Sequence, residues 1–264
     1  MLDLFVRTRK DGVNWIVRKE YLDAVISYSW PKAIEEVEPL LWTRKGRTIY
    51  CVDLAGMKCI VKEFMAKQFG SQLKGFIYQL KYRFVPAPAL REWKVAAIIR
   101  ARGIPTPQPI AIGVRRNVGF LQSSLIVLEK LQGAITLESF IKTLLPSMGI
   151  AEHRRFIQLV GRFYREVHSK GVFQRDFGWR NILIRPGGPE GFLFYLIDFE
   201  EVIFGSDIPL KDKLRGYSQL NRNLKRLLSR TDRLRLFRSY FNDPPVLDQF
   251  YRDLIQKIET YVAI

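Results

Sequence analysis

Residues 168–184 read His-Ser-Lys-Gly-Val-Phe-Gln-Arg-Asp-Phe-Gly-Trp-Arg-Asn-Ile-Leu-Ile, and residues 196–200 read Leu-Ile-Asp-Phe-Glu. Asp176 and Asn181 have the spacing Asp-x-x-x-x-Asn, and Asp198 follows a second apolar run. Phosphoryl transfer requires one carboxylate to orient an acceptor hydroxyl, and an amide and a second carboxylate to hold magnesium. The two segments therefore predict a kinase, with Asp176 as the catalytic residue and Asn181 and Asp198 as metal ligands.

Each of these motifs, taken alone, also has a purely structural explanation. An Arg-Asp pair is often a surface ion pair, and an Asn or an Asp can simply begin or end a strand. The order of the motifs favours a functional explanation. Asn181 begins one apolar run, residues 186–189 (Pro-Gly-Gly-Pro) predict a turn, and a second run over residues 192–197 leads to Asp198. If the two runs pair as a hairpin, the two metal ligands lie side by side.

A kinase also needs a lysine that holds the nucleotide phosphates and a glutamate that positions this lysine. Residues 57–64 predict a strand in which period-two alternation places Lys62 on an inward, apolar face. Residues 89–100 have helical composition and carry Glu92 in their first turns. We expect Lys62 and Glu92 to form the pair. The alternatives are an edge-strand lysine that opposes aggregation and an exposed helix glutamate.

Two further segments would complete the nucleotide site. Residues 125–133 predict the last strand of a small lobe followed by a hinge, where the backbone around Glu129 and Leu131 would meet the adenine. Residues 40–48 would form the hairpin that covers the phosphates, with Gly46 as its one glycine. Three basic residues in that segment could replace the backbone amides of a glycine-rich loop. An ordinary basic turn is the alternative.

From about residue 42 to residue 223 the chain resembles the lipopolysaccharide core kinases, the bacterial Kdo and heptose kinases of the protein-kinase-like superfamily. The most family-like segments are Ile-Val-Lys-Glu-Phe at 60–64, Ala-Leu-Arg-Glu-Trp at 89–93, Gly-Ile-Pro-Thr-Pro-Gln-Pro at 103–109 and the catalytic segment quoted above. The resemblance implies an α+β, two-lobed protein-kinase-like fold. We expect a small β-rich N-terminal lobe with one main helix over residues 1–131, and a larger, mainly helical C-terminal lobe over residues 132–264.

The resemblance also implies ATP and magnesium as cofactors. By this resemblance the matching positions are Asp176 as catalytic aspartate, Asn181 and Asp198 as metal ligands, Lys62 as phosphate lysine and Glu92 as its partner. The chain departs from the kinase pattern at two places. Gln174 stands where kinases usually carry a histidine, and Glu200 stands where protein kinases carry the glycine of Asp-Phe-Gly. Glutamine can still hydrogen-bond and brace the loop, whereas Glu200 argues against protein-kinase regulation.

The acceptor and partners are predicted from the segment after Asp198 and from charge. The segment is short and lacks an Ala-Pro-Glu motif, so a small or carbohydrate acceptor fits better than a polypeptide. With 43 basic and 26 acidic residues the net charge is +17, which favours a polyanionic partner. An anionic glycolipid or membrane surface suits the basic, leucine-containing stretches near the C-terminus, where Lys211, Lys213 and Arg215 would meet the acceptor. A solvated helix face is the alternative, and nucleic acid is a less favoured partner because no named binding motif is found.

We therefore expect ATP- and magnesium-dependent phosphorylation of a Kdo or heptose hydroxyl of the lipopolysaccharide inner core, or of a related anionic glycolipid. The alternatives are a kinase for another small molecule, a kinase for an RNA-associated or protein target, and a nucleotide-binding pseudokinase with a regulatory role. The first residues do not resemble a signal peptide and no apolar run is long enough to span a bilayer. We expect a cytoplasmic protein, with a peripheral position at the inner face of the inner membrane as an option. Cys51 and Cys59 are expected to be buried thiols.

Overall fold

The computed structural model describes most of the chain in nine stretches, which are residues 4–30, 40–44, 46–65, 82, 85–174, 178–199, 201–205, 220–241 and 256. The chain divides into two compact units. Unit 1 comprises Met1–Ile98 and Pro107–Gln132, and unit 2 comprises Ile99–Thr106 and Gly133–Ile264. None of the helices in the described stretches is both long enough and apolar enough to cross a membrane.

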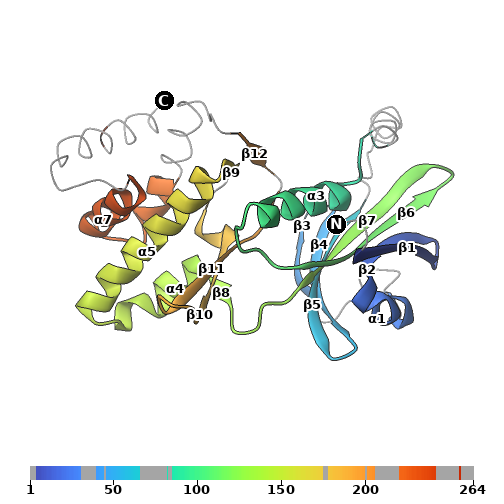
Figure 1. Cartoon of the computed structure of the whole chain (residues 1–264), viewed down its shortest axis with the longest axis horizontal. Coiled ribbons are helices and arrows are strands. Elements are labelled where there is room, and N and C mark those ends of the chain that lie inside the picture. Colours follow the sequence, from blue (N-terminus) through green and yellow to red (C-terminus); the bar gives the residue numbers. More distant parts are fainter. Residues whose placement is uncertain are drawn as a thin grey trace. The chain divides into compact units, whose positions relative to one another are not determined.

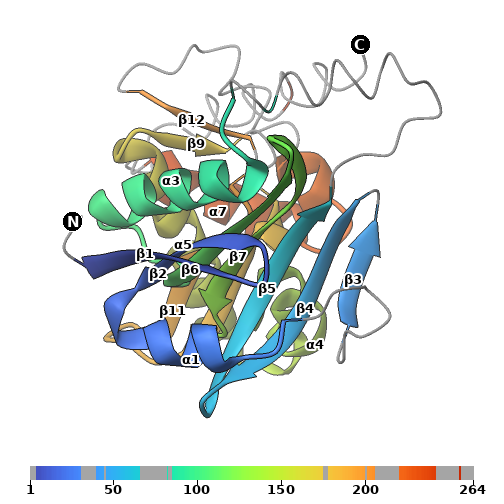
Figure 2. The same cartoon turned by 90° about the vertical axis from the view of Figure 1, so that its right-hand side faces the viewer.

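Unit 1 is built on an antiparallel sheet (Figures 1 and 2), which has seven strands within the described residues. The strand order is β1-β2-β6-β7-β5-β4-β3, so the N-terminal hairpin lies at one edge and β3 at the other. The strands are β1 Phe5–Lys10, β2 Val13–Arg18, β3 Leu40–Arg44, β4 Arg47–Leu54, β5 Met57–Met65, β6 Pro109–Asn117 and β7 Phe120–Glu129. The hairpin predicted over residues 40–48, the strand predicted over residues 57–64 and the strand predicted from residue 125 are therefore present.

Tight turns of one kind connect three of the hairpins. In each turn both central residues have positive φ angles, as in Asp11-Gly12 (51° and 75°), Ala55-Gly56 (52° and 86°) and Val118-Gly119 (45° and 82°). Two left-handed residues in succession form the turn whose twist matches that of the flanking strands. Glycine at the second position adopts this conformation without a steric penalty. The turns therefore fix the registers in which β1 pairs with β2, β4 with β5 and β6 with β7.

The two faces of the sheet carry different helices. Helix α1 (Leu22–Ser27) packs on one face, in a core cluster that includes Val61 and Val127. Helix α3 (Pro88–Ala101) packs on the other face, where Ile126 is buried. Because side chains alternate along a strand, Lys62 points to the α3 face. The helix predicted over residues 89–100 is confirmed, and it begins at the proline because a proline fits the first helical position.

Unit 2 is mainly helical. Helix α5 (Ile150–Ser169) buries an apolar stripe that consists of Phe156, Leu159, Val160, Phe163 and Val167. Helix α7 (Arg230–Phe241) packs against α5 (Figure 1). A methyl group added at Gly161 would overlap the Leu236 carbonyl oxygen, so this glycine allows the two helices to approach closely. Unit 2 also contains α4 Leu137–Thr143 and the 3₁₀ turns Leu145–Ser147 and Trp179–Asn181, while the 3₁₀ turn Lys19–Tyr21 precedes α1 in unit 1.

Unit 2 also contains short strands that lead into the predicted catalytic segment. They are β8 Ile135–Thr136, β9 Val172–Gln174, β10 Ile182–Pro186, β11 Phe192–Leu196 and β12 Val202–Phe204. Strands β10 and β11 pair antiparallel with Ile182 opposite Leu196, which confirms the predicted hairpin. Strand β12 pairs with β9. In the sequence the Asp-Phe-Glu segment therefore lies between β11, which pairs with β10, and β12, which pairs with β9. Both ends of this segment are therefore anchored.

We predict that Val118→Asn stabilises unit 1. Val118 is 89% exposed and has a φ of 45°, a left-handed conformation that branched side chains disfavour and asparagine tolerates. The substitution should increase the free energy of unfolding by about 1 kcal/mol. Thermal unfolding monitored by circular dichroism measures the change. Val118→Thr, which keeps the branch, serves as control and should give no gain, and a similar gain from both variants would contradict the backbone explanation.

Candidate functional site

The predicted lysine and glutamate lie together within unit 1. Lys62 Nζ is 2.5 Å from Glu92 Oε1. Lys62 is 7% exposed and Glu92 is 4% exposed, so both charges are removed from water. A buried charge without a partner is strongly unfavourable, and each of these charges compensates the other. Strand β5 supplies the lysine from the sheet and α3 supplies the glutamate from its second turn.

This ion pair leaves hydrogen-bonding capacity on both side chains. An ammonium group has three N–H donors, of which one is directed to Glu92. The other carboxylate oxygen, Glu92 Oε2, is buried and has no hydrogen-bond partner among the described residues. A buried oxygen of this kind normally has a partner. The α3 face at Lys62 therefore suits a ligand that brings anionic oxygens to the lysine and ordered water to the glutamate.

The neighbouring acid, Glu63, lies on the other face of the sheet. It pairs with Thr48 on β4 and Leu125 on β7. Burial raises the pKa of the Glu63 carboxyl, while a hydrogen bond with Ser123 and the nearby Arg115 oppose the rise. The alternation expected from the sequence, which separates Glu63 from Lys62, is confirmed.

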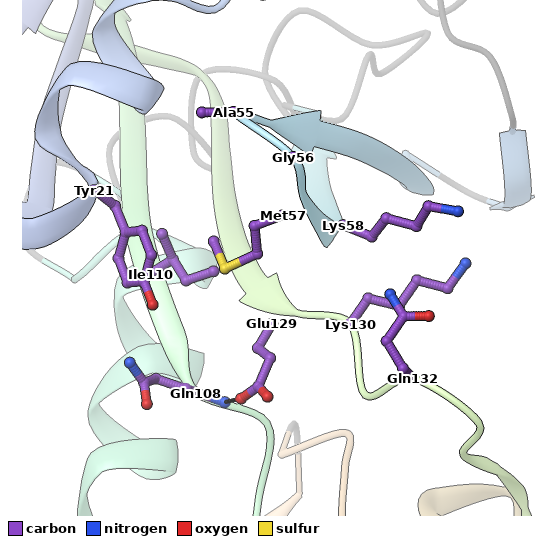
Figure 3. A pocket seen from close by; sticks show the side chains of 10 residues that line it. All are labelled: Tyr21, Ala55, Gly56, Met57, Lys58, Gln108, Ile110, Glu129, Lys130 and Gln132. Carbon is purple, nitrogen blue, oxygen red and sulfur yellow. Dashed lines mark hydrogen bonds between the residues drawn. The ribbon is translucent and has the colours of Figure 1, made fainter.

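In the predicted hinge, the Glu129 side chain lies on the sheet face opposite Lys62. Glu129 lies directly opposite Cys59, whose side chain belongs to the core cluster on the α1 face. The Glu129 side chain therefore points to the face opposite Lys62, and its carboxylate accepts a hydrogen bond from the Gln108 amide at 3.3 Å. It borders a pocket of about 530 Å³ near Tyr21 (Figure 3). A nucleotide contact by Glu129 on the Lys62 face would have to come from its backbone.

Two of the hinge amides are already engaged within unit 1. The Glu129 amide donates to the Gln108 carbonyl at 2.9 Å, and the Lys130 amide donates to the Lys58 carbonyl at 3.1 Å. Among the backbone bonds of the described residues, none involves the Leu131 amide. The predicted adenine contact at Leu131 therefore has a donor that remains available.

Gly46 lies in the turn between β3 and β4. Its φ is 78°, and its carbonyl oxygen accepts a hydrogen bond from the Met65 amide at 2.7 Å. A tight hairpin turn between Arg44 and Arg47 needs a left-handed residue at this position, which is sufficient reason for a glycine. The predicted role of Gly46 over the nucleotide phosphates stays a prediction.

In unit 2 the predicted metal ligands end the two strands of one hairpin. Asn181 directly precedes β10, and Asp198 is the second residue after β11. The Ile197 amide donates to the Asn181 carbonyl at 2.9 Å, which continues the ladder beyond the last strand pair. The hairpin thus fixes the backbones at Asn181 and Ile197 relative to each other, and Asp198 is the next residue along the chain.

Asp198 has an unusual backbone conformation that Gln174 supports. Its φ is 62°, in the left-handed region that residues with side chains seldom occupy. Gln174 is 2% exposed, and its side-chain amide donates to the carbonyl oxygens of Ile197 and Asp198. One amide nitrogen therefore donates to two successive carbonyls. Sequence reasoning identified Gln174 as a hydrogen-bonding replacement for a histidine, but it did not identify these acceptors.

The Gly-Ile-Pro segment at residues 103–105 supports the start of the catalytic segment in unit 2. Gly103 has a φ of 69° and ends α3, where the Ile104 amide donates back to Ile99. The Pro105 carbonyl accepts a hydrogen bond from the Leu196 amide of β11 at 2.9 Å. Arg102 Nη1 donates to the carbonyls of Lys170 and Gly171, at 2.8 and 2.6 Å, just before β9. Arg102 therefore braces the residues just before β9, and the Gly-Ile-Pro segment braces β11.

Several predicted site residues cannot be placed. Asp176, Lys211, Lys213 and Arg215 lie outside the described residues, as does Glu200. Their assigned roles stay predictions.

The described side chains fit magnesium by their chemistry. An amide oxygen from Asn181 and a carboxylate from Asp198 are hard oxygen ligands of the kind that Mg²⁺ prefers, and this ion commonly completes its shell with waters and substrate phosphates. Within the described stretches no cluster of three or more His, Cys, Asp and Glu side chains forms a site of the type that binds a metal entirely through protein ligands. Nδ1 of His168 forms a hydrogen bond of 2.8 Å with the Tyr240 hydroxyl.

The fold is similar to that of WaaP in a solved structure of WaaP in complex with acyl carrier protein. The TM-score is 0.62 at 19% sequence identity, over 92% of this chain and 91% of that chain. This similarity confirms the α+β, protein-kinase-like fold. Because 1507 solved chains match this one in structure, likeness of fold does not by itself identify a substrate. No curated protein sequence matches the chain significantly.

Membership of a family rests on the sequence itself. Residues 44–240 match the Lipopolysaccharide kinase (Kdo/WaaP) family, which is about three quarters of the chain. The matched range contains Lys62, Glu92, Asn181 and Asp198, together with Asp176. The chain therefore belongs to the lipopolysaccharide kinase (Kdo/WaaP) family.

Proposed function

We propose that this protein transfers the γ-phosphoryl group of ATP, with magnesium, to a sugar hydroxyl of the lipopolysaccharide inner core, on Kdo or heptose, or of a related anionic glycolipid. Family membership supports a lipopolysaccharide kinase. The observation that carries the catalytic part of the proposal is the buried ion pair between Lys62 and Glu92. Retention of all five kinase positions in one chain, namely Lys62, Glu92, Asp176, Asn181 and Asp198, favours an active kinase over a nucleotide-binding pseudokinase.

Lys62 would hold the α- and β-phosphates of the nucleotide. Glu92 fixes the ammonium group at one position, so that the remaining N–H donors are oriented before the nucleotide arrives. Donors held in advance need little reorganisation when charge develops, which is the main source of electrostatic catalysis. The Leu131 amide, and the backbone beside Glu129, would meet the adenine, and the turn at Gly46 would cover the phosphates.

Asn181 and Asp198 would hold magnesium, which neutralises charge on the transferring phosphoryl group. The hairpin and the Gln174 amide fix the backbone around these ligands. Asp176, two residues beyond the end of β9 at Gln174, would accept or orient the proton of the acceptor hydroxyl. The transition state is largely metaphosphate-like, so positioning matters more here than the strength of the base.

The acceptor and its setting follow from charge. A net charge of +17 favours an anionic acceptor and an anionic membrane surface, which we place at the inner face of the inner membrane in the cytoplasm. Lys211, Lys213 and Arg215 would contact the phosphates or carboxylates of the glycolipid. The similar WaaP structure contains acyl carrier protein, and we propose that protein as a partner to be tested by co-purification with this chain.

The first prediction about catalysis distinguishes the roles proposed for Asp176 and Asp198. Asp176→Ala should lower turnover by about 10²–10⁴-fold and leave nucleotide binding intact, because only acceptor orientation is lost. Asp198→Ala should abolish transfer and also weaken binding of magnesium-ATP. Transfer of labelled phosphate to lipopolysaccharide precursors, and calorimetric titration with magnesium-ATP, measure the two effects. Asp23→Ala on α1, an exposed position, is the control. Near-normal turnover of Asp176→Ala at saturating substrate would refute its assignment.

The second prediction concerns the ion pair. Lys62→Met and Glu92→Gln should each lower kcat/KM, and the double variant should be only slightly worse than Lys62→Met, because both residues act through one contact. A double-mutant cycle on kcat/KM measures the coupling. The matched control is the exposed pair of Arg162 and Glu190, also 2.5 Å apart, changed to Met and Gln. This control should leave kcat/KM unchanged, and fully additive losses at Lys62 and Glu92 would show that the two have separate roles.

The third prediction tests the substrate class. Replacing Lys211, Lys213 and Arg215 with glutamate should raise KM for an anionic glycolipid and leave KM for ATP unchanged. The effect should decrease at high salt, because ions screen charges that lie in solvent. The control makes the same change of charge at exposed positions elsewhere in unit 2, namely Arg154, Arg155 and Arg230. Unaltered glycolipid KM in the first variant at low salt would exclude this region from acceptor binding.

A further inference from the structure

Unit 1 contains a second pocket, of about 470 Å³, at the edge of the sheet on the α3 face. It is lined by β1, β2, β6 and the first turn of α3. We call it the β1 groove and define it by Arg7 and Arg9 on its rim and Ile16, Leu90 and Val114 on its floor. Figure 2 shows α3 alongside β1, and the edge-to-face contact of Phe5 with Trp93 joins the same two elements.

The floor of the β1 groove is apolar and only half-buried. Ile16, Leu90 and Val114 are each partly exposed, while Ile112 beneath them is 1% exposed. Leu90 and Val114 also border the core cluster between α3 and the sheet. The groove is therefore a part of the α3 packing face that no described element covers. A concave, partly exposed apolar surface with a few polar groups around it commonly marks a binding site.

The rim of the groove is cationic. On β1, Arg7 lies opposite Ile16 and Arg9 lies opposite Asn14, so both arginines project on the same face as the floor. Both are exposed, and neither makes a hydrogen bond or ion pair with the described part of the chain. The residues that line the groove include no acid. Within the described stretches these two positive charges therefore have no counter-charge, which leaves them suited to an anion.

The start of β1 extends this apolar and cationic surface. Leu4 is 50% exposed, and Phe5 packs edge-to-face on Trp93 with ring centroids 5.3 Å apart. Aromatic and leucine side chains beside arginines are characteristic of protein surfaces that enter the boundary between lipid headgroups and acyl chains. A water-soluble anion would use the arginines and would gain nothing from the apolar floor. An amphiphilic anion would use both.

We propose that the β1 groove docks unit 1 on an anionic phospholipid membrane, with one acyl chain of a phospholipid on the apolar floor and its phosphate paired with Arg7 and Arg9. This inference rests on the proposed function only for its setting, a kinase whose acceptor is a membrane glycolipid. It assigns a membrane contact to unit 1, whereas the sequence indicated the basic stretches of unit 2. Binding here would hold the protein at the surface where its acceptor is found.

Vesicle flotation tests the groove without ATP or acceptor, so its outcome does not depend on the proposed activity. The protein should bind vesicles that contain phosphatidylglycerol and should not bind pure phosphatidylcholine vesicles. Each basic residue near an anionic surface contributes about fivefold to binding, so Arg7→Ser with Arg9→Ser should weaken binding about 30-fold. The matched control, Lys19→Ser with Lys58→Ser, removes two exposed charges outside the groove and should weaken it less than about threefold.

A phosphatidylglycerol with a photoreactive group at the end of one acyl chain locates the contact. Label should be found on β1, β2 or the first turn of α3, and the arginine variant should lose it while keeping the thermal unfolding curve and its turnover on a glycolipid in detergent. Three results would overturn the proposal: no binding to anionic vesicles, an equal loss of binding in the lysine control, or label confined to other segments. If the wild-type protein binds the vesicles but shows no turnover on a glycolipid, the result counts against the proposed kinase activity and not against the groove.

Discussion

A lysine buried in the middle of an apolar strand imposes the strongest constraint on unit 1. Removing one partner from a buried ion pair costs about 3–5 kcal/mol, since the other charge is left in a medium that cannot solvate it. Helix α3 must therefore lie where Glu92 reaches Lys62. Apolar contacts between α3 and the sheet, such as those of Ala89 and Ile126, hold the helix in the same place. Packing and electrostatics thus fix one geometry together, and the site depends on it.

Much of the fold follows from local patterns. The α3 helix, which was predicted over residues 89–100, has helical composition and was located to within one position at each end. The hairpin of β1 and β2 with α1 was not predicted. Strand β1 contains Arg7, Arg9 and Lys10 and few apolar residues, as is common on an edge strand. Its Asp-Gly turn and the alternation that follows over residues 13–17 were the signals that could have identified it.

The candidate site was predictable where the order of residues along the chain determines it. The pairing of β10 with β11 followed from two apolar runs and a turn between them. The acceptors of the Gln174 amide could not be predicted, because they depend on how β9 meets the end of β11 in space. Glu129 was predicted to border the nucleotide, and only its register opposite Cys59 reveals that its side chain occupies the other face. Contacts between distant segments need the tertiary structure.

The amide of Gln174 has a consequence for the conditions under which the metal-binding loop keeps its shape. A histidine has an ordinary pKa of about 6.5, so its charge would change between mildly acidic and neutral pH. A glutamine amide carries no titratable proton, and the nitrogen of this one donates to the carbonyls of Ile197 and Asp198. The left-handed conformation of Asp198 is therefore supported equally in mildly acidic and in neutral surroundings. Exchange of the amide for a carboxylate would instead place three acceptors together and remove that support.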